Sequence, residues 1–307
     1  MFIVNSYSLA IVFCFVTMLC WGSWGNTQKL AGKTWRYELF YWDYVIGVLA
    51  LSLILAFTLG SVGSAGRSFI PDLAQADLKN IGSAFLGGII FNAANILLST
   101  AIAMVGMAVA FPVGIGLALV LGVIINYLGF QKGDPLFLFL GVGLVTVAIL
   151  LNAVAYKSVS AENKKVTSKG IINPAQGMMT PYTATVIFSL GIFISNFIFN
   201  TILMKRPIHG EPTHYKTYFK GKFPIHLVGI LGGIIWGIGN SLNLIAAGKA
   251  GAAISYGLGQ GATLVAALWG VFIWKEFKGA SKKTTFMLVV MFILFLLGII
   301  SIIYAGN

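Results

Sequence analysis

One stretch of this chain is present twice. Residues 86–126 read LGGIIFNAANILLSTAIAMVGMAVAFPVGIGLALVLGVIIN, and residues 231–271 read LGGIIWGIGNSLNLIAAGKAGAAISYGLGQGATLVAALWGV. The copies align without a gap at an offset of 145, with 14 identities in 41 positions that include Asn95/Asn240 and Gly106/Gly251. Both copies are apolar enough to lie in lipid. Duplicated membrane units of this kind are typical of secondary transporters, which bind substrate between the two units.

The composition agrees with a membrane protein. The chain is 58% hydrophobic and 9% charged, and no soluble domain of 307 residues could bury that much apolar surface. The net charge of +12 comes from Lys and Arg in short loops between apolar runs. These residues indicate topology and contact with anionic lipid headgroups, so no nucleic acid is expected as a partner.

Nine segments are long and apolar enough to cross the hydrocarbon core, which takes about 20 residues per helix. They are 6–25, 39–60, 81–104, 107–129, 135–156, 184–205, 225–247, 250–274 and 283–304. The sequence therefore predicts an all-α, polytopic integral membrane protein. We expect a first repeat at 1–156 with five spans, a polar basic linker at 157–183, and a second repeat at 184–307 with four spans.

The offset of 145 shows which helix is absent from the second repeat. It maps 39–60 onto 184–205 and 135–156 onto 280–301, but it maps the first span, 6–25, onto the charged linker. With nine crossings, the 20 Lys and Arg split 12 to 8 between the two sides; an inverted second half splits them 16 to 4. The charges thus favour an inverted plan of five helices per repeat. Residues 170–183 cannot cross as open chain, so they form a short helix buried against protein or the chain is a shortened family member; we favour the second.

Polar side chains within spans are the first candidates for a substrate site. Asn92 and Asn95 share one helix face with Ser99. The corresponding span of the second repeat carries Asn240 and Asn243, and the next span carries Tyr256 and Gln260. Their amides and hydroxyls are suited to a polar solute. The alternative is that they only join helices, with about 0.6 kcal/mol per contact.

Trp21 and Trp24 lie one turn apart near the end of the first span, beside Asn26. Aromatic rings stack on sugars and on flat heterocycles, so these three residues are further candidates for substrate binding. Anchoring in the aromatic belt of the membrane is an equally good interpretation of the tryptophans.

Carboxylates are scarce, and Asp43 is the only one well inside a predicted span, with Glu38 at the same membrane edge. An intramembrane carboxylate can bind and release a proton, so these two residues are candidates for proton coupling. The alternative for Asp43 is an interfacial carboxylate paired with Lys29 or Arg36. The histidines and cysteines form no pattern typical of a metal site or of acid–base catalysis, so we expect no metal and no enzyme activity.

Four segments resemble bacterial relatives of the ureide permeases, near the glucose/ribose and rhamnose uptake branches of the drug/metabolite transporter superfamily. They are WGSWGNTQKL at 21–30, ELFYWDY at 38–44, AVAFPVGIGLALVLG at 108–122 and ISYGLGQGATLVAALWGVFIWKEFKG at 254–279. The resemblance implies ten helices in two inverted repeats, a central cavity opened alternately to either side, and location in the bacterial cytoplasmic membrane. The longer central loop of the plant members, with its nucleotide-type motif, has no match here, so no cofactor is expected.

Together these features predict a secondary-active permease for a small, polar, uncharged metabolite, either ureide-like or a sugar, with proton coupling as a hypothesis. Two alternatives stay open: a dedicated sugar porter, and a shortened membrane subunit that does not transport. The expected partners are the solute and the lipid bilayer. The sequence leaves open whether the chain forms a homo-oligomer.

Overall fold

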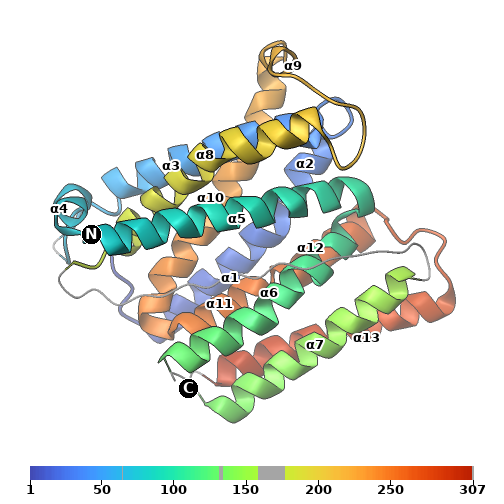
Figure 1. The fold of residues 1–307 in the computed structure, drawn as a ribbon. Helices are drawn as coiled ribbons and strands as arrows, with labels where there is room; N and C mark the ends of the chain where they lie inside the picture. Colours follow the sequence, from blue (N-terminus) through green and yellow to red (C-terminus); the bar gives the residue numbers. More distant parts are fainter. Residues whose placement is uncertain (64, 131–133, 158–176, 306–307) are drawn as a thin grey trace. The chain divides into compact units, whose positions relative to one another are not determined.

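The computed structural model describes residues 1–63, 65–130, 134–157 and 177–305, and within these ranges every regular element is a helix (Figure 1). The elements are α1 Tyr7–Ser23, α2 Gly25–Ala31, α3 Tyr37–Phe57, α4 Phe69–Gln75, α5 Leu78–Val105, α6 Met107–Phe130, α7 Pro135–Lys157, α8 Pro181–Lys205, α9 Tyr215–Phe219, α10 Phe223–Ala250, α11 Ala252–Gln260, α12 Ala262–Leu268, the π-helical turn η1 Trp269–Ile273, and α13 Lys282–Tyr304.

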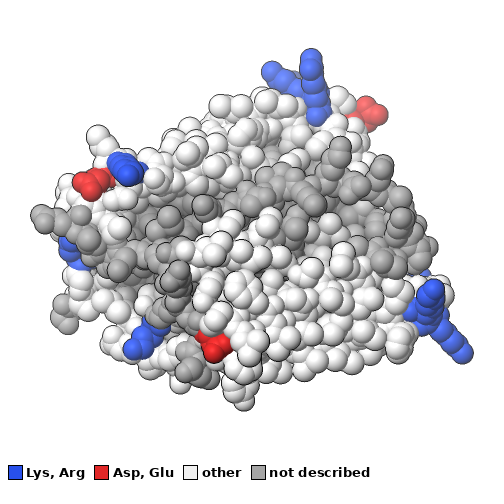
Figure 2. Space-filling view, turned by 60° about the horizontal axis from the view of Figure 1, so that its bottom comes forward, with Lys and Arg blue, Asp and Glu red and all other residues white. Residues whose placement is uncertain are grey.

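Eight helical stretches of the described chain are long and apolar enough to cross a membrane. The remaining predicted span, 135–156, falls on α7, where the stretch Pro135–Leu151 is apolar but shorter. In Figure 2 the charged side chains stand in small groups with broad uncharged surface between them. These findings confirm the prediction of an all-helical, polytopic integral membrane protein.

The chain packs as two compact units, and each takes helices from both halves of the sequence. Unit 1 is Met1–Val4, Trp24–Met104 and Ile172–Ser241, and unit 2 is Asn5–Ser23, Val105–Ile171 and Leu242–Asn307. Unit 1 thus holds α2, α3, α4, α8, α9 and most of α5 and α10. The predicted domains follow the sequence repeat, whereas these units follow packing, so the two divisions describe different properties of the chain.

In unit 1, α3 and α8 pack side by side and run in opposite directions. Near the start of α3, the backbone carbonyl of Glu38 accepts a hydrogen bond from Nδ2 of Asn200, near the end of α8, at 2.8 Å. Near the end of α3, Ala56 packs in one cluster with Val186, near the start of α8. These two helices correspond under the repeat offset, so partner helices of the two repeats run antiparallel here.

Glycine lets α5 and α8 approach each other closely. A Cβ atom added at Gly88 would collide with the carbonyl oxygen of Phe188, and one added at Gly191 would collide with that of Phe85. Any larger residue at either glycine would separate the backbones, which is why small residues are common where membrane helices cross.

The contact of α10 with α3, also within unit 1, has the same construction. A Cβ atom at Gly233 would collide with the carbonyl oxygen of Tyr44, and one at Gly47 with that of Ile230. Each contact here has a counterpart between α5 and α8. Adding 145 to a residue number in α5 gives the equivalent residue in α10, and subtracting 144 from a number in α8 gives the equivalent residue in α3. The two helix crossings are therefore equivalent in sequence and in structure.

In unit 2, α7 and α13 pack along each other, also in opposite directions. Oγ of Ser301 donates to the carbonyl of Phe137 at 2.6 Å, and the N–H of Asp134 donates to the carbonyl of Ala305 at 2.6 Å. Further along, a Cβ atom at Gly298 would meet the side chain of Val145. These helices cover the repeat segments 135–156 and 280–301, so a second partner pair is antiparallel.

The turns before α6 and α11 are equivalent as well. Gly106 and Gly251, one repeat offset apart, both have positive φ angles, of 82° and 92°, which suit glycine and disfavour residues with a Cβ. At the first turn, the Glu276 carboxylate accepts hydrogen bonds from the N–H groups of Met107, at 3.0 Å, and Ala108, at 2.7 Å. These bonds satisfy donors at the start of α6 that have no partner within the helix.

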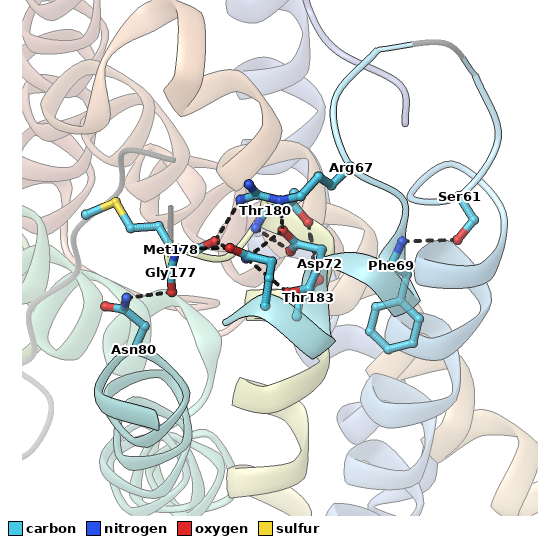
Figure 3. Close-up of polar contacts among 10 residues, drawn as sticks. Ser61, Arg67, Phe69, Asp72, Asn80, Gly177, Met178, Thr180 and Thr183 are labelled. Carbon is cyan, nitrogen blue, oxygen red and sulfur yellow. Dashed lines mark hydrogen bonds and ion pairs between the residues drawn. The ribbon is translucent and has the colours of Figure 1, made fainter. Parts of the chain in front are cut away.

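The chain just before α8 is held by α4 through a buried carboxylate (Figure 3). Asp72 Oδ1 accepts from Nε of Arg67 at 3.0 Å, and Oδ2 accepts from the N–H of Thr180 at 2.7 Å. The carbonyl of Met178 accepts from Nη2 of Arg67 at 3.1 Å and from Nε2 of Gln75 at 2.8 Å. Thr180, the residue that precedes α8, is thereby fixed, while the predicted linker 157–183 lies mostly outside the described residues.

We expect Asp72→Asn to destabilise the protein by about 2 kcal/mol, because the amide replaces a charged acceptor of buried hydrogen bonds with a neutral one. Thermal unfolding in detergent measures the effect. Glu211→Gln makes the same chemical change at an exposed carboxylate and serves as the control. Equal melting temperatures for the two variants would contradict a stabilising role for Asp72.

Candidate functional site

A network of buried amides and hydroxyls joins three helices of unit 1. Tyr41, on α3, donates its hydroxyl proton to Asn92 Oδ1, on α5, at 3.0 Å. Asn92 Nδ2 donates to Oγ of Ser195, on α8, at 2.9 Å. Asn95 Nδ2 donates to the hydroxyls of Tyr41, at 3.1 Å, and Tyr44, at 3.2 Å. All five side chains are buried, and the tyrosines lie three residues apart on one face of α3, as the asparagines do on α5.

An aromatic cluster borders this network through Tyr44. The ring of Tyr44 lies 4.9 Å from that of Trp24 and 6.3 Å from that of Trp236, measured between centroids. Phe91 lies 4.7 Å from Trp236 and 5.3 Å from Phe188. Five rings, from α3, α5, α8, α10 and the residue that precedes α2, thus gather beside the amides, an arrangement suited to the faces of a flat polar molecule.

Two groups at the border of network and rings keep unused hydrogen-bonding capacity. Oδ1 of Asn95 accepts no hydrogen bond from a described residue, and the Tyr44 hydroxyl accepts from Asn95 but donates to no described residue. An amide oxygen and a hydroxyl proton are a neutral acceptor and a neutral donor. The site can therefore pair with an uncharged solute that offers both kinds of group.

The segment that follows Trp24 is fixed to α5 by a reciprocal pair. Nε2 of Gln28 donates to the carbonyl of Ser99 at 2.7 Å, and Oγ of Ser99 donates to Oε1 of Gln28 at 2.9 Å. Both side chains are buried. The pair orients α2 and so positions the Trp24 ring against Tyr44.

A second polar cluster of unit 1 surrounds Asp43 on α3. Oδ2 accepts from Nε1 of Trp35 at 3.1 Å. Oδ1 accepts from the hydroxyl of Tyr218 at 2.6 Å and lies 2.8 Å from Nδ1 of His226. The Asp43 side chain is 1% exposed, and that of His226 is 18% exposed. A buried carboxylate next to a partly exposed imidazole is a pair between which a proton can move.

The Asp43 cluster is covered from outside the membrane spans by the short helix α9, which carries Tyr218. Burial, followed by the hydrogen bond to Asp43, raises the pKa of the Tyr218 hydroxyl above its usual range. The hydroxyl therefore stays protonated and donates a hydrogen bond to the carboxylate. On the α10 side, a Cβ atom at Gly229 would collide with Asp43, so glycine allows this close packing.

Glu38, the other predicted candidate for proton coupling, has a different environment from Asp43. Arg36 holds its carboxylate through Nη2, at 2.6 Å, and Nε, at 3.2 Å. The hydrogen bond to Glu38 raises the pKa of the Arg36 guanidinium, which stays charged. The alternative pairing of Asp43 with Arg36 is therefore wrong, since Arg36 binds Glu38. A carboxylate with a permanent cationic partner is a poorer proton carrier than one beside histidine.

Other predicted site residues lie in unit 2. Asn243 is buried in α10, where Nδ2 donates to the carbonyl of Ser255 at 2.7 Å. Trp21 and Asn243 both face Gly259, since a Cβ atom there would contact each of them. The Tyr256 hydroxyl donates to the carbonyl of Ala118 at 3.2 Å, and Oε1 of Gln260 is buried without a partner among the described residues.

The predicted set is thus divided between the units. Trp24, Asn92 and Asn95 come together around Tyr44, whereas Trp21, Asn243, Tyr256 and Gln260 belong to unit 2. Asn26 and Asn240 are half-buried in unit 1.

Four members of the network and the cluster were not predicted from the sequence: Tyr41, Tyr44, Ser195 and Trp236. His226 was not predicted as the partner of Asp43 either. The helical spacing of Tyr41 and Tyr44 could have indicated the tyrosines. Nothing local in the sequence indicates that His226 meets a residue 183 positions away.

Comparison with known proteins identifies the family. The ureide permease family model matches residues 40–176 and 169–305. Ureide permease 2 of Arabidopsis thaliana is 24% identical over 389 aligned positions that cover 96% of each chain, and ureide permease 1 of the same plant is 23% identical over 97% of each. These alignments are longer than the 307-residue chain, so the plant relatives carry segments that it lacks.

Another relative is a Streptococcus pyogenes serotype M1 protein whose name proposes sugar uptake; it is 25% identical, over 94% of this chain and 96% of its own length. The family matches confirm the prediction of a membrane transporter rather than an enzyme. Since the family model covers most of the sequence in two overlapping matches, the chain belongs to the ureide permease family.

Proposed function

We propose that this protein is a secondary-active carrier of a small, polar, uncharged metabolite, which it moves across a bacterial cytoplasmic membrane by alternating access. The observation that carries the proposal is the contact of Tyr44 with both the Asn95 amide and the Trp24 ring. Neutral donors and acceptors beside aromatic faces suit a flat neutral solute better than an ion. A ureide-like compound fits this chemistry, and the names of the plant relatives point the same way.

The antiparallel partner helices support the inverted-repeat plan of the drug/metabolite transporter superfamily as the frame of this mechanism. α3 and α8 in unit 1, and α7 and α13 in unit 2, are pairs that the repeat relates and that run in opposite directions. Inverted repeats give a carrier two exchangeable arrangements, one open to each side.

A dedicated sugar porter is the second candidate, favoured by the name of the streptococcal relative and by the stacking of sugars on aromatic rings. A shortened subunit that does not transport is the third, motivated by the opening helix that the second sequence repeat lacks.

Uptake by purified protein in proteoliposomes separates these candidates. We expect saturable uptake of radiolabelled allantoin, faster with an inward-directed proton gradient and absent from protein-free liposomes. Glucose taken up in place of allantoin, or glucose alone raising the melting temperature, would establish the sugar porter. No uptake of any solute in a metabolite panel would favour the non-transporting subunit.

Tyr44→Phe removes one hydroxyl and keeps the aromatic ring, so we expect KM for the transported solute to rise about tenfold, the equivalent of one hydrogen bond. Initial rates at varied solute concentration measure the change. Tyr304→Phe, which removes a hydroxyl from an exposed side chain of α13, is the matched control. Equal KM values for the two variants would remove Tyr44 from the solute site.

We infer that Asp43 and His226 couple transport to protons. Asp43→Asn should abolish uptake driven by a proton gradient and leave solute exchange by counterflow intact, because the amide keeps the hydrogen-bond acceptor but cannot ionise. Glu211→Gln serves again as the control. Gradient-driven uptake at the wild-type rate by Asp43→Asn would place coupling elsewhere and leave the carrier proposal standing.

A further inference from the structure

Asn196, on α8, is buried in unit 1 with its hydrogen-bonding groups unused. The side chain is 0% exposed, and neither Oδ1 nor Nδ2 has a hydrogen-bond partner among the described residues. Most buried polar groups in proteins are paired, and an unpaired amide costs free energy. An amide in this state is therefore available to pair with a ligand.

Polar atoms without a hydrogen-bond partner among the described residues recur along α8. Oγ of Ser189 and Oδ1 of Asn200 are also buried without a partner in the described part of the chain. Ser189, Asn196 and Asn200 are spaced by seven and four residues, which places them on one face of the helix. Only Nδ2 of Asn200 is bonded, to the carbonyl of Glu38. One face of α8 therefore presents polar groups to the interior of unit 1.

Asn196 directly follows a member of the amide network. Ser195 receives the hydrogen bond of Asn92 and donates its own proton to the carbonyl of Gly191 at 2.7 Å. The two neighbours thus differ: Ser195 is fully engaged in joining α5 to α8, whereas Asn196 is free to pair with something else. Both lie on the same turn of α8, at the level of Asn92.

We propose that Asn196 is a specificity-determining residue of the solute site, pairing through Oδ1 and Nδ2 with an adjacent N–H and C=O on a planar neutral solute. A carboxamide presents its acceptor and its donor side by side in one plane. The complementary edge is an N–H next to a C=O, as in ureido, lactam and imide groups. The inference rests on the carrier function proposed above, and it favours a ureido-type solute over a sugar.

Hydantoin and 1,3-dimethylhydantoin test this pairing, because methylation removes both N–H groups and keeps the ring and its carbonyls. We expect the wild-type protein to bind hydantoin about tenfold more tightly than the dimethyl compound, as measured by titration in detergent. Asn196→Leu should weaken hydantoin binding about tenfold and bind the two compounds equally well. Asn5→Leu, the same change at an exposed asparagine, should keep the wild-type preference.

The melting temperature without solute checks that the variant is folded. Removal of an unpaired buried amide should leave it unchanged or raise it, whereas loss of a structural hydrogen bond would lower it. Asn196→Ala provides a second variant if the leucine does not fit. A folded Asn196 variant that still prefers hydantoin would overturn the assignment and leave the carrier proposal intact. A wild-type protein that neither binds nor transports any solute would overturn both.

Discussion

Unit 1 depends on the approach of backbone to backbone at two helix crossings. At Gly88 and Gly191, α5 and α8 come so close that no side-chain atom fits between them, and α10 and α3 do the same at Gly233 and Gly47. In lipid, association of helices relies on such packing, because apolar side chains gain little by leaving hydrocarbon for protein. The short separation of α5 and α8 also lets Asn92 reach Ser195 across the interface. Gly88 and Gly191 therefore permit the polar network, because they bring the two helices within hydrogen-bonding distance of each other.

The two crossings are equivalent in backbone but not in chemistry. The repeat relation takes the pair Asn92–Ser195 to Gly237–Leu51, and a Cβ atom at Gly237 would indeed meet the Leu51 side chain. One crossing thus carries an amide–hydroxyl bond where the other carries an apolar contact. The two crossings therefore share a backbone frame, whereas the buried polar network belongs to only one of them.

The sequence was sufficient for the helices and for part of the site. The apolar runs located the eight membrane-spanning candidates of the described chain, because the hydrocarbon core sets a minimum length for each of them. The spacing of Asn92 and Asn95 correctly indicated one helix face. The sequence could not show that Trp21 and Trp24 belong to different units. The chain passes from one unit to the other between them, where α1 ends at Ser23 and α2 begins at Gly25. The contact of His226 with Asp43 was equally hidden, because tertiary packing and not local pattern brings α3 and α10 together.

The surroundings of Asp43 have an electrical consequence. Its described contacts are tryptophan, tyrosine and histidine, with no lysine or arginine to hold a fixed positive charge beside it. Under the proposed coupling, the form loaded with proton and neutral solute carries no net charge at this position, whereas the empty form carries −1. A membrane potential that is negative inside would then act on the return of the empty carrier and not on the loaded step. Each 100 mV contributes about 2.3 kcal/mol per elementary charge, enough for a roughly fifty-fold gradient of solute without any difference in pH.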